Sequence, residues 1–288
     1  YRVEQASIRD QCSWVHASEP GKATEKAKDL VRMGVSRAAL IEPLPMPSVP
    51  VNQSALVVGG GMAGLFAAIK AREEGVQVVL VDKNYVSRSG STAFAEGDFS
   101  LFNPDWDHDL GAWTDQVARK GEYLNDPEWT EITIRESGER YQDLATWGVK
   151  AKEDDDGSVL RYGRPAGFGP LECCFLGRGW TFLPKLRLRA LQVGVVIVDR
   201  VMISDLLHVD GVIVGAVGFH VRTGAFQEFR AKATILCTGN GTFRNVPGAM
   251  GPVGHLSFDG EVMAYRCGAR ISGKEYCSEG AACFLVEK

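Results

Sequence analysis

The 288-residue sequence lacks several features that would place it in a simple class. Its seven cysteines form no CxxC pair, which argues against a disulfide framework or a zinc ribbon. Its longest apolar stretch, Ser54 to Ile69, covers 16 residues, whereas a membrane-spanning helix needs about 20. The 32 basic residues are outnumbered by 36 acidic ones, which disfavours a partner with a phosphate backbone. We therefore expect a soluble, cytoplasmic protein with no membrane span, no signal peptide and no nucleic-acid partner.

Potential metal ligands are sparse as well. Cys12 and His16 stand four residues apart and could share a helix face, but two ligands do not complete a four-coordinate site. Cys267, Cys277 and Cys283 lack the spacing of ferredoxin cysteines. No metal site is predicted, although the sequence leaves open an iron–sulfur cluster on Cys12 or on the C-terminal cysteines.

Glycine, in contrast, is abundant. The chain has 33 glycines in 288 residues, which exceeds the roughly 7% of an average protein. They follow no collagen-like period, so they indicate tight turns and places where the backbone approaches a ligand closely.

The pattern along the chain predicts three parts. Residues 1–42 form an N-terminal helical segment, because apolar residues recur at helical spacing after Thr24 and Glu25. Residues 43–52 form a Pro-rich linker, in which four prolines cannot continue a helix. Residues 53–288 form the main domain, which begins with an apolar run typical of a strand buried on both faces of a parallel sheet.

A nucleotide-binding fingerprint opens this domain. Gly59, Gly61 and Gly64 follow a short strand and open a helix that Gly75 closes, and a second buried strand ends at Asp82. In this context the glycines allow a tight turn, close approach of a pyrophosphate and close helix packing. The helix N-terminus would face the phosphates, and the carboxylate of Asp82 would accept hydrogen bonds from a ribose.

The rest of the domain is predicted to contain both helices and strands. We expect helices over 109–123 and 127–148, the second capped by Asp126. A charged turn is expected at 152–158 and a buried strand at 195–199. Hairpin turns at Asp210-Gly211 and Thr223-Gly224 then predict an added β-meander, followed by an apolar strand that ends at the glycine turn of residues 237–239.

The segment after Asp82 indicates which nucleotide binds. GSTAFAEG at 90–97 resembles the flavin-contacting loop of the fumarate reductase, succinate dehydrogenase, L-aspartate oxidase and adenylylsulfate reductase flavoproteins. Segments 199–224, 231–241 and 257–271 resemble further parts of the same family in the same order. The resemblance covers about 53–276. It implies an α/β, Rossmann-like FAD-binding fold with a parallel sheet and an added β-meander, here with a short N-terminal helical segment.

The same resemblance implies the contacts with FAD. Three glycines would face the pyrophosphate, two residues would lie near the adenosine ribose, five would surround the flavin, one would meet adenine through its backbone, and three would close the site. In that order they are Gly59, Gly61 and Gly64; Asp82 and Lys83; Ser89, Gly90, Ser91, Thr92 and Gly97; Val201; and Thr238, Gly239 and Asp259. A strand-end turn and a helix cap are the alternative roles for Thr238 and Asp259.

Some positions depart from the family pattern. Ser91 stands where succinate dehydrogenases carry the histidine that bonds covalently to FAD, which implies a non-covalent cofactor. Glu96 and Asp98 replace a glutamine and a glycine of the family. We expect both to place negative charge near the flavin.

The N-terminal segment resembles a different group. Residues 6–16 and 23–44 are similar to the segment that precedes the FAD domain in the A subunit of heterodisulfide reductase and its relatives. Those proteins are FAD and iron–sulfur electron-transfer subunits, so this likeness implies electron-transfer partner subunits that hold iron–sulfur clusters.

Two functions therefore remain open. One is a flavin-dependent oxidoreductase that moves a hydride to or from a small dicarboxylate or similar substrate; the other is an electron-transfer FAD subunit without its own small substrate. If the chain were an NAD-dependent dehydrogenase, the resemblance of residues 90–97 to a flavin-contacting loop would be a coincidence. His255 and Arg266 are interpreted as surface or packing residues, so the catalytic residues stay unknown. Because the family draws its substrate-binding groups mostly from a capping domain, expected to be missing here, residues 1–288 alone should bind FAD without turning over a dicarboxylate.

Overall fold

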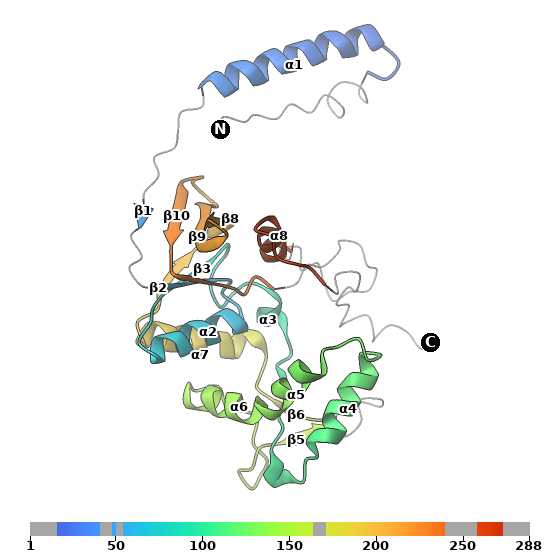
Figure 1. The fold of residues 1–288 in the computed structure, drawn as a ribbon, viewed down its shortest axis with the longest axis vertical. Helices are drawn as coiled ribbons and strands as arrows, with labels where there is room; N and C mark the ends of the chain where they lie inside the picture. The colour runs from blue at the N-terminus through green and yellow to red at the C-terminus, as the bar shows by residue number, and fades with distance from the viewer. Residues whose placement is uncertain (1–15, 41–47, 50–53, 164–170, 240–257, 273–288) are drawn as a thin grey trace. The chain divides into compact units, whose positions relative to one another are not determined.

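The computed structural model describes residues 16–40, 48–49, 54–163, 171–239 and 258–272. It divides into two compact units, Tyr1–Pro45 and Met46–Lys288 (Figure 1). Cys12, His255, Cys277 and Cys283, and most of the predicted linker, lie outside the described residues.

The first unit contains one long helix, α1 (Pro20–Leu40). The helix lies within the segment predicted to be helical; proline fits its first turn, and the Thr24 hydroxyl donates to the Pro20 carbonyl oxygen (2.9 Å). Ion pairs between residues three apart support it along its length: Glu19–Lys22, Glu25–Lys28 and Asp29–Arg32.

A four-stranded parallel sheet forms the centre of the second unit, in the order β11-β2-β3-β7. The strands are β2 (Ser54–Val58), β3 (Gln77–Asp82), β7 (Val196–Asp199) and β11 (Ala233–Leu236). Helices α2 (Met62–Glu73) and α7 (Gly179–Gln192) cover one face of the sheet (Figure 1). All four strands are parallel, so their carboxyl ends meet at one edge.

The central strands are buried on both faces, as the sequence predicted. Ala55 and Val57 pack into the core beneath α2 and α7. Leu56 and Val58 point to the other face, where they pack with apolar residues of the second sheet. Strand β7 differs, because it lies at the edge of the sheet. The expectation of a fully buried strand at 195–199 was therefore wrong, and Val196 is 57% exposed.

The second sheet is the expected β-meander. It contains β8 (Val201–Val209), β9 (Val212–His220) and β10 (Phe226–Arg230), with Asp210 and Gly211 in the tight turn at φ 50° and 78°. Strand β1 (Ser48–Val49) pairs in parallel with β10, so part of the predicted linker is sheet instead. The eight-residue helix α8 (Asp259–Arg266) packs against β8.

A third region joins a small antiparallel sheet to three helices. The sheet has the order β4-β6-β5, with β4 (Asp98–Ser100), β5 (Arg161–Gly163) and β6 (Glu172–Phe175), and the charged turn at 152–158 precedes β5. The short helix α3 (Ser91–Phe94) and the 3-10 turn η2 (Pro104–Trp106) precede the helices α4 (Leu110–Lys120), α5 (Pro127–Arg135) and α6 (Ser137–Thr146).

The single helix expected over 127–148 is broken at Glu136. The start was predicted correctly, because the Asp126 carboxylate accepts from the Trp129 N–H (3.0 Å) and Pro127 occupies the first position. At the break the Phe102 backbone comes close. Its N–H donates to the Ser137 hydroxyl (2.9 Å), and a Cβ at Gly138 would lie 2.8 Å from its carbonyl oxygen. This long-range contact, absent from any local pattern, explains the break.

Among the described helices, none combines the length and apolar character that a membrane crossing requires.

Candidate cofactor site

A cavity of about 180 Å³ lies at the carboxyl edge of the parallel sheet. Its lining comes from the loop after β2, the loop after β3, the start of α3 and the turn after β11. The residues are Gly59, Gly60, Gly61, Met62, Ala63, Asp82, Lys83, Asn84, Ser89, Gly90, Ser91, Thr92, Cys237, Thr238 and Gly239. Segments that are distant in sequence therefore meet where ligands bind in open α/β sheets.

A smaller cavity of about 50 Å³ adjoins it and shares Gly59, Asp82, Lys83 and Thr238 with it. Apolar side chains of β8 and α8 contribute to its lining, namely Val201, Met202, Ile203 and Met263. The larger cavity is thus rich in glycine, and the smaller one combines these apolar side chains with the charged side chains of Asp82, Lys83 and Asp259.

The three fingerprint glycines occupy different environments. Gly59 has φ +114°, and a Cβ there would lie 2.1 Å from the Cys237 carbonyl oxygen. A Cβ at Gly64 would lie 1.8 Å from the Gly59 carbonyl oxygen, so helix and strand pack without room for a side chain. At Gly61 the nearest atom is the Thr92 hydroxyl, at 3.4 Å. Protein packing explains Gly59 and Gly64, whereas Gly61 leaves space on the cavity side.

Helix α2 starts at this space without a side-chain cap. Gly61 is its N-cap residue and offers no side chain, and the Met62 N–H makes a long hydrogen bond of 3.5 Å to the Thr92 hydroxyl of α3. The first N–H groups of a helix lack intrahelical acceptors and carry the positive end of the helix dipole. This end of α2 can therefore receive an anionic group such as a pyrophosphate.

Asp82 ties the two loops of the cavity together. Its carboxylate accepts hydrogen bonds from the Gly60 N–H (2.6 Å), the Asn84 N–H (2.7 Å) and the Ser89 hydroxyl (3.1 Å). A carboxylate offers about four acceptor positions, so three are used within the chain. The predicted role toward a ribose would use the remaining position.

Lys83 and Asp259 both line the smaller cavity and form an ion pair there. The Lys83 ammonium is 2.7 Å from the Asp259 carboxylate, which links the end of β3 to the start of α8. Close by, a Cβ at Gly260 would lie 2.2 Å from the Thr238 hydroxyl. The ion pair joins segments 176 residues apart in the sequence, and Thr238 and Asp259 both line the smaller cavity, where the role of closing the site on FAD stays a prediction.

The loop that resembles a flavin-contacting loop is held by backbone packing. Gly90 has φ +80°, a conformation that favours glycine. The start of α7 presses against α3, because a Cβ at Gly179 would lie 1.6 Å from the Thr92 carbonyl oxygen. Gly97 lies outside both cavities. A Cβ there would lie 1.9 Å from the Gly177 carbonyl oxygen, so packing accounts for this glycine.

The two acidic residues Glu96 and Asp98 lie outside both cavities as well, and other side chains pair with them, so negative charge beside the flavin stays a prediction. Glu96 is 3.7 Å from the guanidinium of Arg178, which offsets its charge. Asp98 accepts a hydrogen bond from the Tyr162 hydroxyl. Burial, this hydrogen bond and the charge of Asp98 raise the pKa of Tyr162.

Twelve of the fourteen predicted site residues line the two cavities, and Gly64 and Gly97 do not. Sequence reasoning missed Asn84 and Cys237, which also line the larger cavity. The available signal was position: Cys237 directly follows a parallel strand, so it had to reach the same edge as Gly59. Burial raises the pKa of the Cys237 thiol, which keeps it protonated. Among the described residues, no group of three acidic, histidine or cysteine side chains is placed to bind a metal ion.

The family profile of the FAD binding domain matches residues 54–276. The chain belongs to this family. The match spans all the residues that line the two cavities. The start of α2 and the space at Gly61 fit a cofactor with a pyrophosphate, and the apolar side chains that β8 and α8 contribute to the smaller cavity fit an adenine.

Known proteins resemble the chain in two ways. The A subunit of fumarate reductase (CoM/CoB) from Methanothermobacter marburgensis is 29% identical over 231 residues, which cover 76% of this chain and 40% of that protein. An iron-sulfur A subunit of CoB–CoM heterodisulfide reductase from Methanopyrus kandleri is 52% identical over 83 residues, which cover 29% of this chain and 13% of that protein. The chain thus spans less than half the length of these relatives.

Solved structures agree on the fold. Quinol fumarate reductase of E. coli superposes with a TM-score of 0.67 at 25% identity, over 77% of this chain and 37% of that one. Adenylylsulfate reductase of Archaeoglobus fulgidus superposes with a TM-score of 0.64 at 26% identity, over 78% of this chain and 37% of that one. The α/β fold with its parallel sheet and the FAD cofactor, both predicted from the sequence, are confirmed.

Proposed function

We propose that the chain is the FAD-binding part of a flavin-dependent oxidoreductase that acts on a small dicarboxylate or a similar substrate and holds its FAD non-covalently. The observation that carries this proposal is the cavity at the start of α2, formed by loops within the region that matches the FAD binding domain, in a chain 29% identical to the fumarate reductase relative over 231 residues. Non-covalent binding is supported by Ser91, whose hydroxyl cannot form the covalent link that histidine makes in succinate dehydrogenases.

Each part of the site would contact a different part of the cofactor. The first N–H groups of α2 would bind the pyrophosphate, and Gly61 would let it approach the backbone. Asp82 and Lys83 would lie near the adenosine ribose, and Val201 would meet adenine. Ser89, Gly90, Ser91 and Thr92 would surround the flavin ring, and Gly239 would help to close the site. The flavin, when bound, supplies a two-electron carrier able to exchange a hydride.

A second function is supported by a separate observation. Heterodisulfide reductase A subunits from several methanogens are 45% to 52% identical to this chain over 83 residues, well above the 29% found for the fumarate reductase relative. The chain could accordingly serve as an FAD relay that exchanges electrons with an iron–sulfur partner protein, without a small-molecule substrate.

One experiment separates the two functions. The native protein, purified with any bound subunits, is reduced anaerobically and mixed with fumarate or with oxidised ferredoxin while flavin absorbance is followed. The first function predicts that fumarate reoxidises the flavin at about 1 per second or faster, an ordinary enzymatic rate. Reoxidation by ferredoxin alone would favour the electron relay, and no reoxidation by either acceptor would contradict both functions.

A further inference from the structure

Two charged residues outside the cavities, Arg187 on α7 and Asp199 at the end of β7, form a close ion pair. The guanidinium makes two contacts with the carboxylate, Nη1 to Oδ1 at 3.1 Å and Nη2 to Oδ2 at 2.8 Å. Both side chains are largely buried, with exposed fractions of 18% and 22%. Asp199 pairs in register with Asp82 on the neighbouring strand, so the ion pair lies beside the cofactor edge of the sheet.

The pair holds the segment of residues 83–88, which follows Asp82. The Val86 N–H donates to Asp199 Oδ1 (2.8 Å), and Arg187 Nη1 donates to the Val86 carbonyl oxygen (3.1 Å). Both backbone polar groups of Val86 are therefore bound by the pair. The guanidinium also stacks on the Tyr85 ring, 4.2 Å from its centroid.

Segment 83–88 in turn supports the glycine loop. The Val86 side chain is fully buried, and a Cβ at Gly60 would lie 2.7 Å from it. The Ser87 N–H donates to the Gly60 carbonyl oxygen (3.0 Å), and Ser87 takes a positive φ of 75°, which costs energy in any residue but glycine. Because Ser87 is strained and contacts the glycine loop, it keeps this conformation only while the residues on either side of it are held in place.

We propose that Arg187 and Asp199 are positioning residues for FAD: they hold segment 83–88 so that Lys83, Asn84 and the glycine loop keep the shape that binds the cofactor. Neither residue lines a cavity. Their effect on FAD would pass through Val86 and Ser87.

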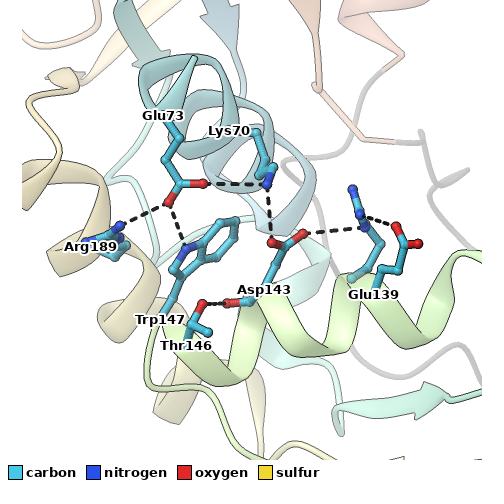
Figure 2. A network of polar contacts seen from close by, with 8 residues as sticks. Lys70, Glu73, Glu139, Asp143, Thr146, Trp147 and Arg189 are labelled. Atoms are coloured by element: carbon cyan, nitrogen blue, oxygen red, sulfur yellow. Dashed lines mark hydrogen bonds and ion pairs between the residues drawn. The ribbon is translucent and has the colours of Figure 1, made fainter. Parts of the chain in front are cut away.

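The same helix provides a matched control. Arg189, two residues along α7, donates to Glu73 Oε1 at 3.0 Å, and so also forms an ion pair with a carboxylate from another element. Its partner lies at the C-terminal end of α2, within a cluster joined to α6 (Figure 2), and does not line either cavity. Loss of this pair changes helix packing without touching segment 83–88.

The test compares Arg187→Lys and Asp199→Asn with Arg189→Lys. The apoprotein of each variant is titrated with FAD, and the quenching of flavin fluorescence gives the Kd. In a separate experiment the apoprotein is unfolded in urea to give the midpoint of unfolding. We expect the Kd for FAD to rise about tenfold in the first two variants and to stay within twofold in Arg189→Lys, while Arg187→Lys and Arg189→Lys lower the urea midpoint by similar amounts.

The proposal is overturned if the Kd is unchanged in folded Arg187→Lys and Asp199→Asn, or if Arg189→Lys raises it equally. Should the charged variants fail to fold, Tyr85→Leu decides, because this ring is 42% exposed and its removal takes away only the stacking contact. It should raise the Kd about threefold, and an unchanged Kd would count against the proposal.

Discussion

The two ends of helix α2 are built in opposite ways. The N-terminal end uses glycine, carries no side-chain cap and lines a cavity. The C-terminal end is tied to α6 and α7 by side chains: Glu73 accepts from Trp147 Nε1 (3.1 Å) and Arg189 (3.0 Å), and the Lys70 ammonium is 3.2 Å from the Asp143 carboxylate (Figure 2).

This difference separates stability from binding within one helix. At one end the first N–H groups lack intrahelical acceptors and face the cavity, with only a long hydrogen bond of 3.5 Å from the Met62 N–H to the Thr92 hydroxyl, so they can receive a phosphate. The contacts at the other end anchor α2 to its neighbours. Substitutions at Gly61, on the cavity side, and at Glu73, in the anchored end, should therefore change different measured quantities, whereas Gly64 at the N-terminal end serves packing. Four variants, at Gly64, Gly61, Asp82 and Glu73, separate packing from binding in order of decreasing effect.

The largest effect is expected from Gly64→Ala. The added Cβ would lie 1.8 Å from the Gly59 carbonyl oxygen, so helix and strand must separate. We expect the free energy of unfolding of the apoprotein to fall by about 3 kcal/mol in urea titrations. Gly61→Ala is the control, because its Cβ meets no atom closer than 3.4 Å. Equal midpoints for the two variants would contradict the packing role of Gly64.

Gly61→Val should act on the cofactor rather than on folding. The valine side chain would fill the space kept for the pyrophosphate, so the Kd for FAD should rise about 100-fold, which corresponds to about 2.7 kcal/mol. The free energy of unfolding of the apoprotein should fall by no more than about 1 kcal/mol, the usual cost of an unfavourable residue at an N-cap position. Flavin retained at wild-type affinity would show that Gly61 does not face the pyrophosphate.

Asp82→Ala should have an intermediate effect. It removes an acceptor for two backbone N–H groups and the Ser89 hydroxyl, and with it the predicted contact to the ribose. We expect FAD binding to weaken by about 1–3 kcal/mol, the scale of a lost charge-assisted hydrogen bond. Isothermal titration of the apoprotein measures this, and an unchanged affinity would exclude Asp82 from the site.

The smallest effect is expected from Glu73→Gln, at the far end of α2. Burial alone would raise the pKa of Glu73, but the hydrogen bonds from Arg189 and Trp147 and the charge of Lys70 outweigh it and lower the pKa below its usual 4.5. The ionised form is thus favoured by folding. The ionised carboxylate therefore stabilises the fold above about pH 4.5, and this stabilisation is lost as the pH falls through the pKa that Glu73 has in the folded state.

At pH 7 this variant should lose about 0.5–1 kcal/mol of stability and keep its affinity for FAD. The difference from wild type should shrink as the pH falls below about 4.5 in urea titrations at several pH values. Glu74→Gln, at the next and exposed position, is the matched control. A weakened affinity for FAD in Glu73→Gln would show that the two ends are not independent.

The sequence predicted what depends on local pattern. The strand–glycine–helix unit, the cap at Asp126 and the tight turn at Asp210-Gly211 all follow from short-range rules, and the structure contains them. What it could not predict depends on distant contacts. The break at Glu136 arises from the backbone of Phe102, and Arg187 meets Asp199 and Val86 only after the sheet has formed.

For the site, the sequence named residues but not their internal partners. Lys83 was predicted near the ribose, yet its ion pair with Asp259 joins segments 176 residues apart. Glu96 was assigned to the flavin from its place in a motif, whereas the start of α7 supplies Arg178 beside it. Motif positions show which residues are close in sequence to a ligand-binding loop; only the fold shows where their charges are neutralised.

The central claim, that this chain binds FAD non-covalently at the start of α2, is tested most directly by precipitating the holoprotein with acid and measuring flavin in both fractions. We predict about one FAD per chain in the supernatant and a colourless pellet, because no histidine stands at Ser91 to form a covalent bond. Flavin retained in the pellet would contradict the claim.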